Sequence, residues 1–455
     1  MEFSICVREA ELVRAAGPTP QEIKYLSNID DQMSLRHHIP FVHFFAPKPG
    51  STTKDPCGLI KMALSRTLMY YYPLSGRLRS SSSSGNEGKL VVDCCDEGVM
   101  FREADADITL EKLMMVEGGL KPPFPQWERL LVDDLWGNDL IIDSPLLRIQ
   151  VTRLSCGGFV LAYTLNHCAC DTNGALQFIK TIAEFCCDPH RKAPSIVPSW
   201  GREILKPRSP PIISFRHLEY NLNDLADHET QAKSDLKNLV QTSVFLSNDD
   251  ILALKRQVTD RKCVSFDVIA SCLWRARTRT LFKTIYNNDM SCTMRLLFPI
   301  DTRFQFKPDL PKGFYGSTMV VPSVITTGSE LLEKPLCHAV SLISKAKSEV
   351  VRDEYRASVV DFLDVNKGGE FWDEMFVTDM RWFKFAEVDF GWGKGVYAGP
   401  ARAGVGPVPW TVTSMFYHKN VNGAEGVLAL ISLPSSLVKK FHNEVRREIR
   451  GFSAL

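Results

Sequence analysis

Hydrophobic and polar positions follow two different rhythms along the first 186 residues. Some apolar residues gather into short runs that are typical of strands, and others recur every three or four positions, as in amphipathic helices. The strand-like runs are 41–47, 89–94, 145–154 and 159–166, and the helical ones are 55–73 and 174–186. The run "FVLAYTLN" at 159–166 is nearly all apolar, as a buried strand should be. His167 therefore stands where a buried strand ends and a helix is about to begin.

A proline-rich stretch interrupts this pattern near the middle of the chain. Residues 187–213 hold six prolines and show little periodicity, which is typical of a linker. Beyond it the pattern predicts helices at 248–258, 265–281 and 334–351, and strands at 243–247, 295–301, 410–418 and 426–434. No segment of roughly 20 to 50 residues recurs, so a solenoid or propeller is not expected. We predict two mixed α/β domains, residues 1–186 and 216–455, joined by a crossover at 187–215.

Composition and charge exclude several classes of protein. The 455 residues are 44% hydrophobic and 24% charged, a balance typical of globular proteins. With 54 basic and 53 acidic residues the net charge is +1, and no basic block indicates a nucleic-acid partner. The most apolar stretch, 157–167, is shorter than the roughly 20 residues of a membrane-spanning helix. The 13 cysteines are odd in number and no secretory signal precedes them, so we expect reduced thiols.

Reactive side chains are concentrated in "HCACD" at 167–171. Structural zinc usually needs a repeated C-x2-C pair, and CAC is not the CxxC pair that lowers a thiol pKa. A cysteine nucleophile would normally need a histidine from elsewhere in the fold, because neighbours on an extended chain point apart. The remaining hypothesis is His167 as a general base, with an ordinary pKa near 6.5, and Asp171 orienting it. A buried structural histidine fits this stretch equally well.

A second unusual stretch is rich in glycine. Residues 387–400 include Asp389, Gly391, Trp392, Gly393, Gly395 and Gly399. Glycines this dense indicate unusual backbone dihedrals or the close approach of another segment. A phosphate-binding GxGxxG loop would follow a strand and open a helix, whereas here aromatic residues and Pro400 follow. The stretch is therefore interpreted as a structural loop.

HCACD at 167–171 and DFGWG at 389–393, in this order, resemble the two signatures of the plant BAHD acyltransferases. Four further stretches are similar to the family: "YYPLSGRLR" (71–79), "VTRLSCGGFVLAYTLNH" (151–167), "FDVIASCLWRART" (266–278) and "FPIDTRFQFKPDLPKGFYGS" (298–317). The resemblance runs from about residue 5 to the end of the chain. Residues 151–167 and "LSNIDDQ" (26–32) most resemble the branch of benzyl alcohol benzoyltransferases and alcohol acyltransferases.

The resemblance implies a chloramphenicol acetyltransferase-like α/β fold with mixed sheets and a solvent channel between two domains. Part of 370–400 would then pack against the N-terminal domain. It also implies a monomer that uses acyl-CoA as co-substrate and a small alcohol as acceptor, without a bound cofactor or metal. His167 would take the acceptor's proton and return it to the CoA thiolate.

The same resemblance suggests roles for other residues. Asp171 would pair with Arg303 and hold the loop rather than relay a proton. Asp389, Gly391, Trp392 and Gly393 would shape the domain interface. Thr378 and Trp382 are candidates for the oxyanion site or the channel.

Three positions depart from the branch. Cys168 and Ala169 stand where threonine and methionine are usual, and Asn173 stands where a small residue or proline is common, so we expect an altered pocket beside the base. The branch implies benzoyl-CoA and benzyl alcohol as substrates. Alternatives are an alkaloid, terpenoid or hydroxycinnamoyl acyltransferase, and a binding protein without activity. Ser453-Ala454-Leu455 resembles the peroxisomal S-K-L signal, so peroxisome and cytosol are both expected locations.

Overall fold

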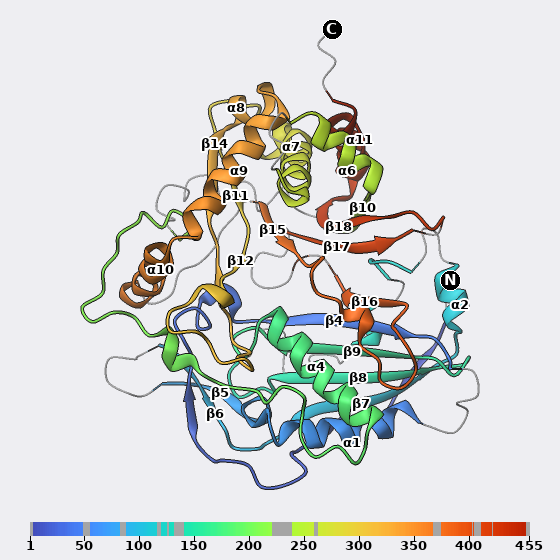
Figure 1. The fold of residues 1–455 in the computed structure, drawn as a ribbon. Coiled ribbons are helices and arrows are strands. Elements are labelled where there is room, and N and C mark those ends of the chain that lie inside the picture. Colours follow the sequence, from blue (N-terminus) through green and yellow to red (C-terminus); the bar gives the residue numbers. More distant parts are fainter. Residues whose placement is uncertain are drawn as a thin grey trace.

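A computed structural model describes residues 3–48, 55–81, 88–115, 120–124, 127–131, 141–220, 239–258, 263–366, 375–402, 404, 411–420 and 422–451. Within these ranges the chain forms two large sheets, each covered by helices (Figure 1). Both sheets contain parallel and antiparallel pairs, which confirms the predicted α/β class with mixed sheets. The tripeptide Ser453-Ala454-Leu455 lies outside the described residues.

The N-terminal sheet has the strand order β1-β7-β8-β9-β4-β16, with β2 beside β7. Its strands are β1 (Ile5–Val7), β2 (Glu11–Val13), β4 (His38–Phe45), β7 (Val99–Ala106), β8 (Leu147–Leu154), β9 (Phe159–Asn166) and β16 (Tyr397–Pro400). Strands β7 and β8 run parallel, whereas β9 pairs antiparallel with both β8 and β4. The outer strand β16 comes from the C-terminal half of the sequence and pairs antiparallel with β4.

Two helices, α1 (Pro56–Leu68) and α4 (Thr172–Cys187), cover one face of this sheet (Figure 1). Helix α1 begins at a proline, and the Asp55 side chain accepts a hydrogen bond from the Gly58 amide. The cap satisfies one of the amides that a helix start leaves free. The helix ends at Leu68, so the predicted helix 55–73 is shorter in the structure. A short 3-10 turn, η2 (Tyr72–Ser75), follows instead.

The C-terminal sheet has the strand order β10-β18-β17-β15-β11-β14. Its strands are β10 (Leu239–Ser247), β11 (Thr293–Leu297), β14 (Ser323–Thr327), β15 (Met375–Asp379), β17 (Val412–Lys419) and β18 (Glu425–Pro434). The helices of this half are α6 (Asn248–Arg256), α7 (Ser265–Ile285), α8 (Gly328–Glu333), α9 (Leu336–Val350), α10 (Asp353–Val365) and α11 (Val438–Arg450). The predicted strand 295–301 ends early, because Pro299 lacks the amide that would continue the ladder.

Smaller elements complete the described chain. They are the three-stranded sheet β3 (Ile23–Tyr25), β6 (Leu90–Asp93) and β5 (Arg77–Ser80), the pair β12 (Ile300–Asp301) and β13 (Met319–Val320), and the helices α2 (Leu110–Met114) and α3 (Trp127–Leu130). Further 3-10 turns are η1 (Met33–Leu35), η3 (Arg202–Leu205), η4 (Arg303–Gln305), η5 (Phe385–Glu387) and η6 (Ser435–Leu437).

The two sheets share a packed interface. Along β18, Leu428 and Leu430 belong to the same hydrophobic core as the N-terminal sheet. The intervening Ala429 and Ile431 belong to a second core with residues of α7, α9 and α11. Because successive strand residues point to opposite faces, one face of the C-terminal sheet packs toward the N-terminal half and the other toward its own helices.

The crossover between the halves is fixed at several points. Arg208 donates a hydrogen bond to the Asp361 carboxylate at 2.6 Å, and the Ser358 hydroxyl on α10 accepts one from the Ser214 amide at 2.9 Å. The bond from Arg208 to Asp361 is charge-assisted, and such bonds are among the stronger polar contacts. The predicted linker is therefore anchored to the C-terminal half rather than acting as a free tether.

Candidate functional site

The HCACD loop connects β9 to α4 and is held by Asn166 at the end of β9 and by His37, which directly precedes β4. The Asn166 side chain accepts a hydrogen bond from the Cys168 amide at 3.0 Å, and its carbonyl accepts one from the Ala169 amide at 3.1 Å. The His167 amide donates to the His37 carbonyl at 2.9 Å. Asn166 is fully buried, so these bonds fix the turn on which His167 stands.

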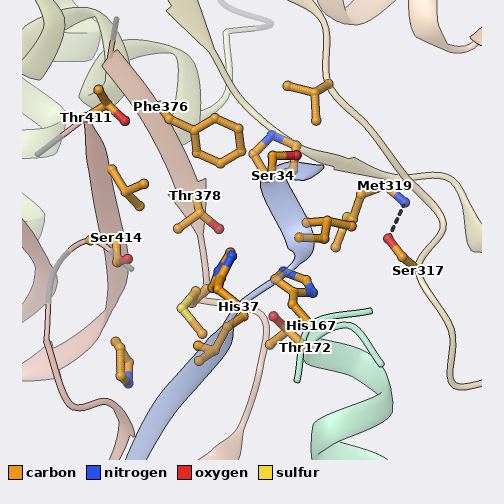
Figure 2. Close-up of a pocket in the computed structure, with 18 of the residues that line it drawn as sticks. Ser34, His37, His167, Thr172, Ser317, Met319, Phe376, Thr378, Thr411 and Ser414 are labelled. Atoms are coloured by element: carbon orange, nitrogen blue, oxygen red, sulfur yellow. Dashed lines mark hydrogen bonds between the residues drawn. The ribbon is translucent and has the colours of Figure 1, made fainter. Parts of the chain in front are cut away.

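His167 borders a cavity of about 160 Å³ between the two halves of the chain. Side chains from the N-terminal half line one side, among them Gln32, Ser34, His37, Ile39, Phe41, His167 and Thr172. Side chains from the C-terminal half line the other, among them Leu297, Met319, Phe376, Thr378, Met380 and Ser414. Figure 2 shows His37 and His167 close together, with Thr378 and Ser414 on neighbouring strands. The cavity is mostly apolar, with a few hydroxyl and imidazole groups.

Burial sets the charge of the His167 imidazole. It lowers the pKa of His167 below the ordinary 6.5, and the negative charge of Asp30 opposes this only in part. The imidazole is therefore neutral at pH 7 and has a lone pair that can accept a proton. The His37 ring stands nearly perpendicular to it, with the ring centroids 5.7 Å apart.

Asp171 has two structural partners. One carboxylate oxygen caps α4 by accepting a hydrogen bond from the Gly174 amide at 2.8 Å. The other lies 2.6 Å from the Arg303 guanidinium. Burial raises the pKa of Asp171 to about 6 against the pull of Arg303, so the carboxylate is still ionised at pH 7. The structure thus brings Asp171 together with Arg303, and the described residues show no hydrogen bond from Asp171 to His167.

Arg202 supports the same loop from the crossover, and no motif or spacing in the sequence singled this residue out. Its guanidinium donates to the Ala169 carbonyl at 2.7 Å and pairs with the fully buried Asp30 at 3.3 Å. It also lies over the Trp200 ring, 3.8 Å from the centroid. Arginines from beyond residue 186 therefore hold the loop at two points, Ala169 and Asp171.

The DFGWG loop lies away from the cavity, on the N-terminal sheet. One Asp389 oxygen accepts hydrogen bonds from the Gly391 and Gly393 amides, both at 2.7 Å. Both glycines have positive φ, 102° and 92°, a region that side chains rarely adopt. Trp392 packs edge-to-face on Phe159, with centroids 5.1 Å apart. None of these residues lines the cavity, and the loop leads directly into β16.

The structure separates the two candidates near residue 380. Thr378 on β15 lines the cavity beside His167. Trp382 does not line it: its surface is 81% exposed, and it borders a second, open pocket together with Lys255 and Tyr417. An oxyanion role for Trp382 is therefore wrong, because its side chain faces this second pocket and not the space beside the imidazole.

The positions that depart from the branch are also outside the cavity lining. Cys168 and Ala169 are fully buried, and the Cys168 sulfur lies 3.4 Å from the Leu35 carbonyl. Asn173 donates to the Asp301 carboxylate at 2.6 Å. The prediction that these residues alter the pocket surface is therefore wrong, because their side chains are used for packing and for holding the loop.

The thiols of the loop are not prepared as nucleophiles. Burial raises the pKa of Cys168 and of Cys170 well above the ordinary range of a thiol. Both sulfur atoms are consequently protonated at neutral pH, and a thiol is a much weaker nucleophile than a thiolate.

The described residues bring together one group of three possible metal ligands, Asp55, Cys57 and Glu103. Arg153 donates hydrogen bonds to Asp55 at 2.6 Å and to Glu103 at 2.7 Å. Its guanidinium already neutralises these carboxylates, and none of the three residues borders the cavity.

Among the described helices, none is both long enough and apolar enough to cross a bilayer.

Comparison with known proteins gives one consistent result. The model of the Transferase family matches residues 3–447. Benzyl alcohol O-benzoyltransferase of Petunia hybrida is 39% identical over 100% of this chain and 95% of its own. 13-Hydroxylupanine O-tigloyltransferase of Lupinus albus is 39% identical over 97% of this chain and 94% of its own. The crystal structure of vinorine synthase, at 18% identity, shares the fold with a TM-score of 0.72 over 96% of each chain.

Proposed function

Because the chain belongs to the BAHD family of acyl-CoA:alcohol acyltransferases and has its chloramphenicol acetyltransferase-like fold, we propose that it transfers a benzoyl group from benzoyl-CoA to benzyl alcohol or a similar small primary alcohol. Acyl-CoA is the co-substrate. The observation that carries the proposal is the position of His167, a neutral buried base beside an apolar cavity that both halves line.

In the proposed reaction His167 serves first as base and then as acid. The acceptor hydroxyl donates a hydrogen bond to the neutral imidazole, which takes the proton as the alcohol oxygen attacks the thioester carbonyl. The resulting tetrahedral oxyanion collapses when the carbon–sulfur bond breaks. The imidazolium then gives its proton to the departing CoA thiolate. The products are an ester and free CoA, without an acyl-enzyme.

Asp171 and Arg303 have a supporting role in this proposal. Their ion pair ties the first turn of α4 to η4 and so fixes the end of the loop that carries His167. Because Asp171 faces Arg303 and the Gly174 amide, it holds the loop and does not receive the proton from His167.

The oxyanion needs a donor close to the base, and Thr378 is the best placed of the predicted candidates. Its hydroxyl lies on β15 in the wall of the cavity (Figure 2). A hydroxyl donor aimed at the developing negative charge stabilises the transition state more than the ground state. We therefore place the thioester carbonyl between His167 and Thr378.

The same strands lead from the cavity to the open pocket at Trp382. Thr378 and Met380 line the cavity, whereas Arg381 and Trp382 border the second pocket. In this proposal the pantetheine chain follows residues 378–382 from one pocket to the other, and Lys255 together with the exposed Trp382 ring suits a phosphorylated nucleotide through charge and stacking. We therefore place the CoA end of the donor at this pocket, which gives Trp382 a role in the channel.

The choice of benzoyl rests on the cavity wall and on the relatives. Phe41, Phe376, Leu297 and Met319 surround the space with aromatic and aliphatic groups. A planar ring can be buried there without needing hydrogen bonds. The benzoyltransferase from Petunia is similar over the whole chain, which supports the same donor.

The proposal is tested by kinetics with a panel of acyl donors. Purified protein is assayed with benzoyl-CoA, tigloyl-CoA and acetyl-CoA at saturating benzyl alcohol, and the products are identified by mass. We expect kcat/KM for benzoyl-CoA to exceed that for acetyl-CoA by about tenfold, the effect of burying an additional apolar ring. A tenfold preference for acetyl-CoA, or no ester with any donor, would contradict the benzoyl assignment.

A further inference from the structure

The motif LSNIDDQ (26–32) forms a buried turn that the proposed reaction does not use. Asp30, in the middle of this motif, is fully buried. The turn fixes its carboxylate, because the Ser27 hydroxyl donates to it at 2.6 Å and the Ser27 carbonyl accepts a hydrogen bond from the Asp31 amide at 3.0 Å. A buried carboxylate is strongly unfavourable unless it is paired and hydrogen-bonded. The partners of Asp30 therefore indicate which parts of the fold depend on it.

Asp30 connects two segments that belong to the site. One carboxylate oxygen accepts a hydrogen bond from the Ser317 amide at 2.8 Å, and the other lies 3.3 Å from the Arg202 guanidinium. Arg202 in turn donates to the carbonyl of Ala169, two residues after His167, at 2.7 Å. Ser317 borders the cavity and belongs to the C-terminal half (Figure 2). The carboxylate thus links the loop of the base to part of the cavity wall.

Dense packing leaves this connection little room to move. The Arg202 and Asp30 side chains are 2% and 0% exposed. The Arg202 guanidinium lies 3.8 Å from the centroid of the Trp200 ring and 4.8 Å from that of Tyr315. Gly316 also approaches it, so closely that a Cβ at this position would lie 2.6 Å from the guanidinium carbon. Because close-packed interiors transmit strain, a change in the Asp30–Arg202 pair should reach the loop of the base.

Asp30 also acts on the imidazole of His167 through its charge. Burial lowers the pKa of His167, and the negative charge of Asp30 raises it again in part. A negative charge near the ring favours the imidazolium that exists while His167 carries the acceptor's proton. The other ionisable groups around the loop are Arg202, the ion pair of Asp171 and Arg303, the protonated thiols Cys168 and Cys170, Arg402 in the cavity wall, and His37, whose pKa is lowered by burial to about 3.

We infer that Asp30 is a positioning residue of the proposed reaction, which holds the loop of His167 through Arg202 and the adjoining cavity wall through the Ser317 amide. This inference rests on the proposed acyl transfer with His167 as its base. Asp30 does not border the cavity, so it acts on the base and not on the substrates. Its removal should change kcat and the pH dependence of turnover, whereas KM should stay nearly the same.

The test replaces Asp30 by asparagine, which removes the charge but keeps the shape of the side chain. Turnover is measured with benzyl alcohol and the acyl-CoA that the wild type uses best. We expect kcat to fall about tenfold, because a small displacement of a catalytic group is costly, and KM for each substrate to stay within about twofold. The acidic limb of kcat/KM reports deprotonation of His167 in the free enzyme. It should move to lower pH by about half a unit, because the charge that raises the pKa of His167 is gone.

Asp31→Asn is the matched control, because Asp31 is the next carboxylate in the same motif. It is also buried, pairs with Arg36 at 2.9 Å and accepts a hydrogen bond from the Leu90 amide at 3.2 Å. Neither partner belongs to the HCACD loop, so kcat and the acidic limb should stay as in the wild type. The same changes in Asp31→Asn as in Asp30→Asn would overturn the inference.

A second variant tests the route through Arg202 and decides the matter if Asp30→Asn does not fold. Arg202→Lys keeps a positive charge beside Asp30 but loses the planar guanidinium that reaches both Asp30 and the Ala169 carbonyl. We expect kcat to fall about tenfold, with the acidic limb in its wild-type place because both charges remain.

The inference is overturned by wild-type kcat in Arg202→Lys, by wild-type kcat in folded Asp30→Asn, or by an acidic limb that does not move in Asp30→Asn. Failure of the proposed function would look different, because the wild type itself would then give no ester with any acyl-CoA.

Discussion

Replacing Asp171 by asparagine separates the structural role of this residue from a catalytic one. Asparagine is as good a helix cap as aspartate, so the hydrogen bond from the Gly174 amide should survive. What is lost is the charge 2.6 Å from Arg303. The substitution therefore isolates the ion pair, whereas Asp171→Ala would remove the cap as well.

The size of the loss follows from the burial of the pair. Removing one partner of a buried ion pair costs about 3–5 kcal/mol. In this variant Arg303 keeps hydrogen bonds to the Phe314 carbonyl at 2.6 Å and the Gly316 carbonyl at 3.3 Å. Because these bonds remain, we expect a loss in the free energy of unfolding at the lower end of that range, about 3 kcal/mol. For a chain of 455 residues, the unfolding entropy is on the order of 1 kcal/mol per kelvin. The melting temperature should then fall by about 3 °C.

The assay combines unfolding and turnover for a double-mutant cycle. Urea unfolding is followed for the wild type, Asp171→Asn, Arg303→Met and the double variant, and kcat is measured for each folded protein. We expect the double variant to be more stable than the sum of the two single losses predicts, by about 2 kcal/mol. The kcat of Asp171→Asn should stay within a few-fold of the wild type, because Asp171 does not contact the base.

Asp55 offers a matched control, because it also caps a helix through a glycine amide and pairs with an arginine, Arg153. Its side chain is 48% exposed, so Asp55→Asn should cost less than about 1 kcal/mol. The reasoning is refuted if Asp171→Asn leaves stability unchanged but abolishes turnover, since Asp171 would then relay the proton.

Three further predictions concern the base, the buried imidazoles and the location. His167→Ala should fold normally and lose about 10²- to 10⁴-fold in kcat, and near-normal turnover would remove His167 from the chemistry. Burial lowers the pKa of His43 to about 3. The contribution of the neutral His43 to the free energy of unfolding is therefore fully present above pH 6.5. It is lost as the pH falls from 6.5 toward 3, by about 1.4 kcal/mol per pH unit. His43→Phe should therefore reduce the stability lost between pH 7 and pH 5 in urea unfolding by about 2 kcal/mol, and an unchanged loss would show that this imidazole is not held neutral. A fluorescent protein fused to the N-terminus should give peroxisomal puncta that vanish when Ser453-Ala454-Leu455 is deleted, whereas diffuse fluorescence from both proteins would indicate the cytosol.

Local periodicity was sufficient to place His167. The apolar run 159–166 and the helical spacing after it predict a strand, a turn and a helix, and the structure has β9, the loop and α4 at these positions. Strand and helix formation depend on neighbouring residues, so a single sequence carries this information. The predicted strand 295–301 is interrupted around Pro299, which is also a local effect.

Long-range partners could not be predicted in the same way. Strand β16 is four residues long, too short for any period to show, and its place is set by pairing with β4 more than 350 positions earlier. Arg202 lies in a proline-rich crossover that reads as a solvated linker, yet its guanidinium is buried against Asp30 and Ala169. The Asp171–Arg303 pair was expected only through the family resemblance, since spacing alone does not bring residues 132 positions apart together.

These long-range contacts explain why the base belongs to neither half alone. The histidine is presented by the N-terminal half, but Arg202 and Arg303, which fix its loop, come from the crossover and the C-terminal half. The same is true of the cavity, where β4 forms one wall and β15 and β17 the other. Buried charges such as Asp30 and Asp171 are stable only when both arginines are in place, because an unpaired buried carboxylate is strongly unfavourable. Residues from beyond the N-terminal half are therefore needed both to hold the loop that carries His167 and to close the cavity beside it.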